Sequence, residues 1–257
     1  MHAGTRYYRS MTAERETATG CRLETLTWVE AEQWFARDPV IVIPLGAAAK
    51  EHGPHLPLNN DAIIAEWLAD EIRKTLPVVV APLVNASYYP AFVEYPGSIS
   101  LSADTARALI VDTCRSFLSF GLRRFYVVNT GLSTLGPLRQ AVEELGADAA
   151  LDYLDLDDAL QALPDALLQQ AYGSHADELE TSLMLHIAPQ VVDMSLAVDD
   201  GAEGDGRLSR HRGHGTWSES GVFGQATLAS ADKGRTIARV LVSRALAQTR
   251  QLIDAAS

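Results

Sequence analysis

Two adjoining stretches decide the fold, Val40-Ile41-Val42-Ile43-Pro44-Leu45 and, four residues later, Lys50-Glu51-His52-Gly53-Pro54-His55-Leu56-Pro57-Leu58-Asn59-Asn60-Asp61. An unbroken apolar run is typical of a strand that is buried on both faces. A helical pattern begins at about Ala62, so a loop stiffened by glycine and proline joins a strand to a helix. Two imidazoles and a carboxylate therefore gather near the carboxyl end of a buried strand, a pattern that favours a hydrolytic metal centre.

The same alternation of apolar runs and helical patterns continues along the chain. Further strands are predicted at residues 78–84, 125–129 and 149–156, with a short extended piece at 98–101. Helices are predicted at residues 61–73, 104–120, 135–145, 179–187 and 231–253, with Asp104 as a cap and Gly121 at the end of the second. This order predicts an α/β fold, a three-layer α/β/α sandwich with a mostly parallel central sheet. The loops after Leu45, Val84 and Asn129 are the expected walls of a site.

Composition narrows the class of protein. The chain has 257 residues, 47% of them hydrophobic, and a formal charge of −12. This predicts one domain, residues 23–257, behind a flexible tail at residues 1–22. The acidic charge argues against nucleic-acid partners, and no apolar run is long enough to cross a membrane. Two distant cysteines without a CxxC pattern indicate a reducing, cytoplasmic location.

Four separated blocks resemble the creatininase (creatinine amidohydrolase) family. The blocks are the 52–61 loop, Tyr95-Pro96-Gly97-Ser98-Ile99-Ser100-Leu101, Ser174-His175-Ala176-Asp177-Glu178-Leu179-Glu180-Thr181-Ser182, and residues 220–224 with 229–234. The resemblance implies the sandwich fold, a homo-oligomer (a hexamer in the family) and a two-metal hydrolase that acts on a small-molecule substrate.

The resemblance also implies two sets of metal ligands, of which this chain keeps one. The second set maps onto His52, Asp61 and Glu180. The first set is lost, because Lys50 stands where the family has a glutamate and Gly131 stands where it has a histidine. Three protein ligands and an open position are the usual arrangement of a catalytic metal. We therefore expect one divalent ion, zinc, manganese or iron, or in the alternative none.

Lys50 has three interpretations. Its ammonium can stand in for the first metal, neutralise Asp61 and polarise a substrate carbonyl. It can form a Schiff base with a carbonyl substrate. It can also be a solvated loop residue in a chain that has lost catalysis. We expect Lys50 to be catalytic as a substitute cation.

The remaining candidates surround this centre. His175 aligns with the proton-transfer histidine of the family, and its imidazole suits donation to a leaving nitrogen. Six residues are candidates for substrate binding or for orienting the ligands: His55, Glu51, Tyr89, Glu94, Ser133 and Trp217. The long 199–221 loop is a candidate lid.

The sequence thus predicts a metal-dependent hydrolase that cleaves a C–N bond of an amide, lactam or cyclic amide in a small polar molecule. Two alternatives stay open. One is a lysine-dependent hydrolase of a ketone-bearing ring, and the other is a catalytically silent binding or assembly subunit.

Overall fold

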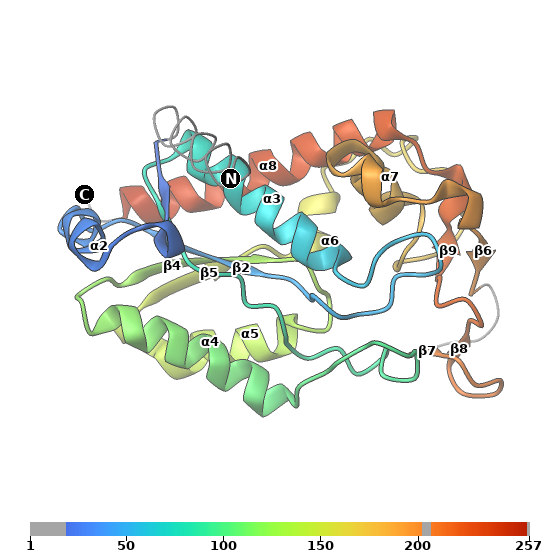
Figure 1. Ribbon diagram of the computed structural model, residues 1–257, viewed down its shortest axis with the longest axis horizontal. Coiled ribbons are helices and arrows are strands. Elements are labelled where there is room, and N and C mark those ends of the chain that lie inside the picture. Colours follow the sequence, from blue (N-terminus) through green and yellow to red (C-terminus); the bar gives the residue numbers. More distant parts are fainter. Residues whose placement is uncertain (1–18, 202–206, 256–257) are drawn as a thin grey trace, which may run out of the picture.

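The computed structural model describes residues 19–201 and 207–255 (Figure 1). A five-stranded sheet runs through its centre in the order β1-β3-β2-β4-β5, and all neighbouring strands are parallel. The strands are β1 (Cys21–Arg22), β2 (Ile41–Leu45), β3 (Val79–Val80), β4 (Arg124–Asn129) and β5 (Ala150–Tyr153). The predicted mostly parallel sheet is confirmed.

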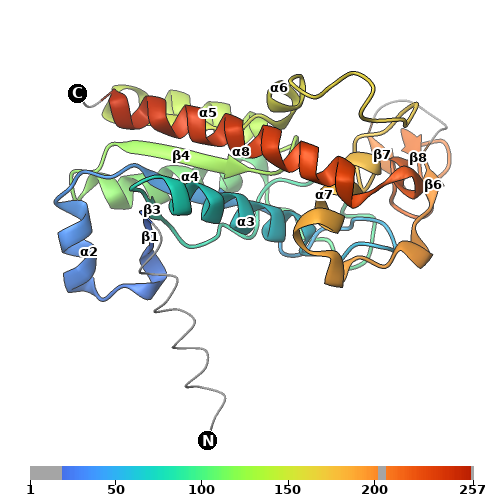
Figure 2. The same ribbon diagram turned by 90° about the horizontal axis from the view of Figure 1, so that it is seen from above.

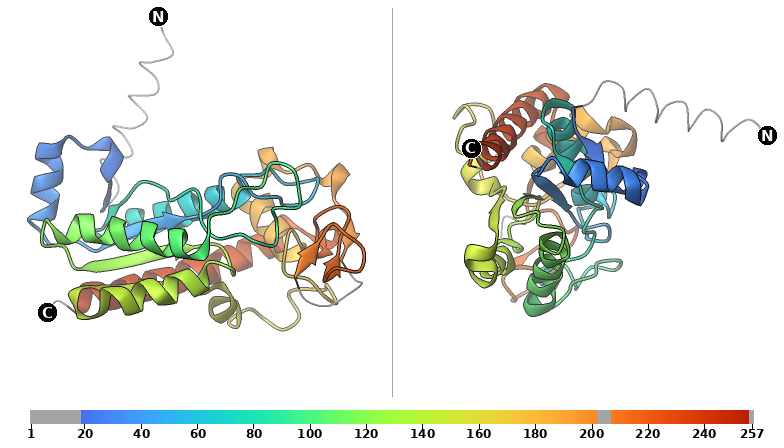
Figure 3. Two further views of the ribbon diagram at one scale, coloured as in Figure 1. Left: turned by 90° about the horizontal axis from the view of Figure 1, so that it is seen from below. Right: turned by 90° about the vertical axis from the view of Figure 1, so that its left-hand side faces the viewer.

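Helices cover both faces of the sheet. Figure 1 shows α3 (Asn60–Thr75) and α8 (Ala231–Asp254) above the strands, and α4 (Ala103–Leu118) and α5 (Leu135–Leu145) below them. The side views in Figure 3 show the same separation of α4 and α8. Three further helices are α2 (Trp28–Phe35), α6 (Leu156–Leu160) and α7 (Glu178–Ile187), and Figure 2 shows α7 beside the amino-terminal end of α8. The predicted α/β/α sandwich is therefore confirmed.

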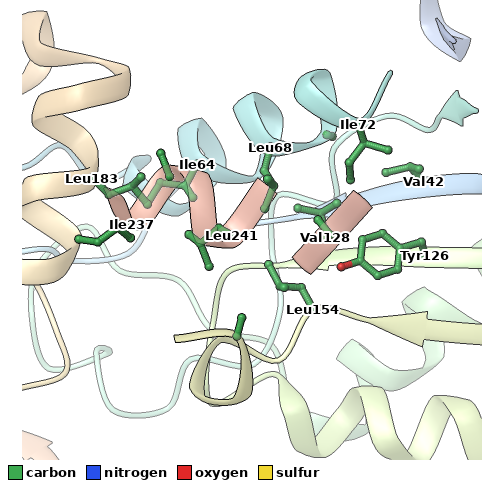
Figure 4. Packing of buried hydrophobic residues seen from close by; sticks show 14 of the residues in the cluster. Val42, Ile64, Leu68, Ile72, Tyr126, Val128, Leu154, Leu183, Ile237 and Leu241 are labelled. Carbon is green, nitrogen blue, oxygen red and sulfur yellow. The ribbon is translucent and has the colours of Figure 1, made fainter. Parts of the chain in front are cut away.

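Side-chain alternation in the strands builds two apolar cores. In β2, Val42 packs with α3, α7 and α8, whereas Ile41 and Ile43 pack with α4 and α5. Figure 4 shows the first core, in which Leu68, Val128 and Leu241 are among the labelled side chains. Successive strand residues point to opposite faces, so a strand between two helical layers must be apolar throughout.

Short paired segments lie at the carboxyl-terminal end of the sheet. They are β6 (Asp199–Asp200) with β9 (Gly224–Gln225), and β7 (Leu208–Ser209) with β8 (Thr216–Trp217), all on the right of Figure 1. Part of the candidate lid, residues 202–206, lies outside the described residues. In the described ranges, no helix is both long and apolar enough to span a membrane.

Several predicted boundaries differ from the structure. The 78–84 strand is regular only at Val79–Val80, with one further bridge between Leu45 and Val84, because Pro82 has no backbone N–H to donate. The predicted cap Asp104 lies within α4, and the side chain of Ser102 caps that helix instead. Residues 98–101 form no strand. The predicted tail lies mostly outside the described residues, but its last two residues form β1.

Candidate functional site

The loop after β2 brings its charged residues into the interior. Gly46 lies so close to α3 that a Cβ atom there would be 2.3 Å from the carbonyl oxygen of Asp61. Only glycine allows this approach, which places Asp61 in the first turn of α3 behind the end of β2. Lys50, His52 and Asp61 are all buried, and Lys50 has only 4% of its surface exposed.

Lys50, Asp61 and His52 form a buried chain of contacts. Lys50 Nζ lies 2.7 Å from Asp61 Oδ2, and His52 Nε2 lies 2.8 Å from Asp61 Oδ1. Burial acts to raise the pKa of Asp61, but Lys50 and His52 outweigh burial and hold that pKa well below its usual range. Asp61 is therefore an anion that Lys50 neutralises.

Two aromatic rings complete the surroundings of Lys50. Its ammonium lies 4.7 Å from the ring centroid of Phe92 and 5.5 Å from that of Tyr89. A cation is attracted by the face of an aromatic ring, and the rings exclude water. Tyr89 itself is buried, and burial raises the pKa of its hydroxyl.

His175 and Glu180 enter the site from the start of α7. His175 is held by an antiparallel bridge to Phe223, and Asp177 caps the helix by accepting from the amides of Leu179 and Glu180. Glu180 Oε2 accepts from the backbone N–H of Ala176 at 2.6 Å and lies 3.6 Å from His175 Nδ1. Ala176 adopts a left-handed conformation with φ +48°, which is uncommon for a residue other than glycine. This strained turn directs the backbone N–H at Glu180.

Hydrogen bonds assign the protonated nitrogen of both site histidines. His52 Nδ1 donates to the carbonyl oxygen of Lys50 at 2.9 Å, and His175 Nε2 donates to that of Glu51 at 2.9 Å. A carbonyl oxygen can only accept, so these nitrogens carry hydrogen. By the same rule His52 Nε2, 2.8 Å from the carboxylate oxygen of Asp61, donates to it while no metal is bound. His52 Nε2 and His175 Nδ1 are the nitrogens that a metal ion would use in place of a proton, and they face Asp61 and Glu180. Metal-binding histidines commonly have this arrangement.

Three of these side chains meet closely enough to hold one ion. One ligand atom each from His52, His175 and Glu180 lie within 4.8 Å of one another. This group contains two of the three predicted ligands, His52 and Glu180. The third member is His175, which the sequence predicted as the proton donor, whereas the predicted ligand Asp61 contacts Lys50 and His52.

Charge around His175 favours its protonated form while no metal is bound. Burial acts to lower the pKa of His175, but the carboxylates of Glu51 and Glu180 outweigh burial and raise it above its ordinary value. Glu51 Oε2 lies 3.2 Å from His175 Nε2. A proton and a metal ion therefore compete for this ring.

Three other predicted residues, His55, Ser133 and Glu94, make hydrogen bonds around the metal-ligand group. His55 Nε2 contacts the hydroxyl of Thr181 at 2.8 Å, and burial lowers the pKa of His55 to about 4. Ser133 donates to the carbonyl oxygen of Tyr88. Glu94 accepts from Ser209 and from the backbone N–H of Arg210, and so fastens the segment that contains β7.

Trp217 does not line the pocket at the centre. Its ring lies 3.5 Å from the guanidinium carbon of Arg212. The tryptophan and Glu94 therefore shape the surrounding loops.

A cavity of about 390 Å³ opens onto this centre. Lys50, His175 and Glu180 line it, together with Thr130 and Ser133 from the loop after β4. The leucines that α6 contributes were not among the predicted site residues, because a strand was predicted at residues 149–156 and no helix was predicted after it. The spacing of Leu156 and Leu160, one helical turn apart, was the available signal.

Comparisons with known proteins agree with this architecture. The family model for creatininase, described as creatinine amidohydrolase, matches residues 24–249. A mycofactocin precursor peptide peptidase from Mycolicibacterium smegmatis is 30% identical over 225 residues, which cover 83% of this chain and 85% of that protein. A 3-dehydro-scyllo-inosose hydrolase from Thermotoga maritima is 24% identical, covering 86% of this chain and 79% of that protein.

A solved structure of a mutant creatininase superposes with a TM-score of 0.76. It has 25% sequence identity, and the match covers 90% of this chain and 98% of that chain. The family model and the relatives span nearly the whole described domain, and the chain belongs to the creatininase family.

Proposed function

We propose that this chain is a hydrolase of an amide-type C–N bond that uses one divalent metal ion, with Lys50 in place of a second. The single observation that carries the proposal is the buried pair of Lys50 Nζ and Asp61 Oδ2 at 2.7 Å, next to the three converging metal-ligand side chains. A cation at this position, inside a family of hydrolases, supports electrostatic catalysis by the lysine.

The donor set suits a divalent ion. His52 and His175 each have one nitrogen donating to a backbone carbonyl oxygen, and Glu180 adds a carboxylate. Two imidazoles and one carboxylate are an established ligand set for catalytic zinc. When bound, such an ion supplies Lewis acidity and lowers the pKa of a coordinated water.

Asp61 has a different role in this proposal from the one that the sequence predicted. Because Lys50 neutralises Asp61, its carboxylate is a weaker ligand than the carboxylate of Glu180. While no metal is bound, Asp61 also accepts a hydrogen bond from His52 Nε2. We therefore assign the third ligand position to His175 and the positioning of Lys50 to Asp61.

Lys50 binds and polarises the substrate. Its ammonium lines the cavity, so a substrate carbonyl oxygen can accept a hydrogen bond from Nζ. The negative charge that develops on that oxygen is then stabilised by a cation whose position is fixed before the reaction. The buried ring of Tyr89 and the partly buried ring of Phe92 lie over the ammonium and limit its contact with bulk water, which strengthens the effect.

Hydrolysis of a ketone-bearing ring is the second candidate. The observation in its favour is the relative named 3-dehydro-scyllo-inosose hydrolase, together with a lysine in the cavity that can polarise a ketone. Covalent capture of Lys50 by borohydride in the presence of a cyclic ketone would favour this candidate. A chain that binds no metal and traps no ketone would instead be the silent binding subunit.

Zinc affinity of single variants tests the ligand assignment. We expect His52→Ala, His175→Gln and Glu180→Gln each to weaken zinc binding by at least about a hundredfold, and Asp61→Asn by about tenfold. His211→Gln, a change at an exposed histidine elsewhere, is the control and should leave the affinity unchanged.

Competition with a zinc-sensitive dye, on variants whose circular dichroism matches the parent, gives these affinities. A large loss in Asp61→Asn with little loss in His175→Gln would overturn the assignment and favour His52, Asp61 and Glu180 as ligands.

A further inference from the structure

The cavity at the site has a polar floor and an apolar wall. The floor consists of buried polar groups, among them Lys50, Thr130 and His175. The wall consists of large apolar side chains, namely Leu132, Leu156, Leu160, Leu168, Leu179 and Phe223. A very small polar substrate would fill the floor and leave this wall in contact with water.

The wall is built from segments far apart in the sequence. Leu156 and Leu160 come from α6, Leu168 from the segment that follows it, and Leu179 from α7. These four leucines pack on the first core and are only partly buried. Leu132 has 40% of its surface exposed. Apolar surface left open in a concave site is a place where an apolar group gains affinity by displacing water.

Charge in the cavity is distributed unequally. Among the described residues, Lys50 is the only lysine or arginine that lines it, and this ammonium is already paired with Asp61. Asp157, which is exposed, lines the cavity next to Leu156 on α6. A ligand with a carboxylate at its far end would meet repulsion and find no counter-ion there.

We propose that the substrate is an amide whose reacting carbonyl carries an uncharged apolar group of about four to eight carbons, alkyl or aryl. The carbonyl lies at Lys50 and the apolar group lies against the leucines of α6 and α7. A volume of about 390 Å³ holds such a group together with the amide, and is larger than a small polar ring requires. This inference rests on the proposed function, and it replaces the small polar molecule predicted from the sequence.

A series of hydroxamic acids tests the substrate class by direct binding. The hydroxamate group binds zinc, so the series anchors one end at the floor and varies only the other. We expect zinc-loaded protein to bind hexanohydroxamic and 3-phenylpropanohydroxamic acids at least about tenfold more tightly than acetohydroxamic acid, because each buried methylene adds up to about fourfold. Adipic monohydroxamic acid, which ends in a carboxylate, should bind more weakly than its hexanoic counterpart. Isothermal titration calorimetry measures each affinity.

Two matched variants test whether the apolar wall of the cavity causes the preference for apolar hydroxamates. Leu132→Ser should reduce the preference for the phenyl compound by about threefold or more. Leu196→Ser is the control, since Leu196 is 49% exposed and lies away from the cavity. Equal affinities along the series, or equal effects of both variants, would overturn the substrate class and leave the metal site standing. Failure of every hydroxamate to bind zinc-loaded protein would overturn the metal site of the proposed function, and the substrate class with it.

Discussion

The charge and protonation of the side chains in this site depend on the groups that contact them. Lys50 would be costly to bury alone, and Asp61 at 2.7 Å compensates for the loss of water. Two backbone carbonyl oxygens each accept from one ring nitrogen of His52 and of His175, so that the other nitrogen of each ring, which a metal ion would need, faces Asp61 or Glu180. The metal-ligand geometry therefore depends on main-chain acceptors as much as on the side chains themselves.

A double-mutant cycle measures the Lys50–Asp61 pair. Asp61→Asn alone should lower the free energy of unfolding by about 3–5 kcal/mol, because it leaves a buried ammonium without its counter-ion. Lys50→Met alone should also destabilise, and should raise the pKa of Asp61 by removing the nearby cation. In the double variant the two losses should cancel in large part. Urea unfolding at neutral pH gives the free energy of unfolding of the parent, of the two single variants and of the double variant. If the loss in the double variant equals the sum of the two single losses, the two charges do not interact.

The sequence predicted some site residues and left others undefined, for physical reasons. The motif after β2 places Lys50, His52 and Asp61 together, since they are close in sequence within one stiff loop. The position of His175 depends on a bridge to Phe223 and on a left-handed Ala176. Neither feature has a pattern in the local sequence, so reasoning from motifs predicted the residue but not which groups its ring would face.

At the scale of elements, long periodic segments were predicted closely and short ones were missed. The predicted 135–145 helix matches α5, since amphipathic periodicity over several turns is a strong signal. Helix α2 was missed, although Thr27 and Glu30 form a capping box whose spacing was visible in the sequence. None of its residues is buried, so the helix has little core pattern to recognise.

The correction at the start of α4 can be tested by paired substitutions. Ser102 accepts a hydrogen bond from the backbone N–H of Thr105. We expect Ser102→Ala to lower the free energy of unfolding by about 1 kcal/mol, because a helix amide loses its acceptor. Asp104→Ala, the residue that the sequence suggested, should change stability by less than about half of that, through the helix dipole alone. Chemical denaturation compares the two, and a larger loss in Asp104→Ala would contradict the capping contact.

At the scale of the whole molecule, the parallel sheet determines where the site lies. Strands β2 and β4 end at the same edge, and the loops that follow them supply Lys50, Thr130 and Ser133 to one cavity. The far half of the chain completes the site, because α7 is packed on α8 at that edge (Figure 2). The homo-oligomer and the cytoplasmic location stay predictions, and sedimentation velocity measures the first.

The central claim is that one metal site remains and that Lys50 replaces the other. The most direct measurement is the metal content per chain, by elemental mass spectrometry, of protein purified without a tag or chelator and then reconstituted with zinc, manganese or iron. The predicted result is about one ion per chain, rising to about two in Lys50→Glu with Gly131→His. A Cβ at Gly131 would lie 3.2 Å from Thr134 Oγ1 and 3.4 Å from the Tyr89 ring, so the added histidine requires the side chain of Thr134 to shift by a few tenths of an ångström. No bound metal after reconstitution, or two ions in the unaltered chain, would contradict the account.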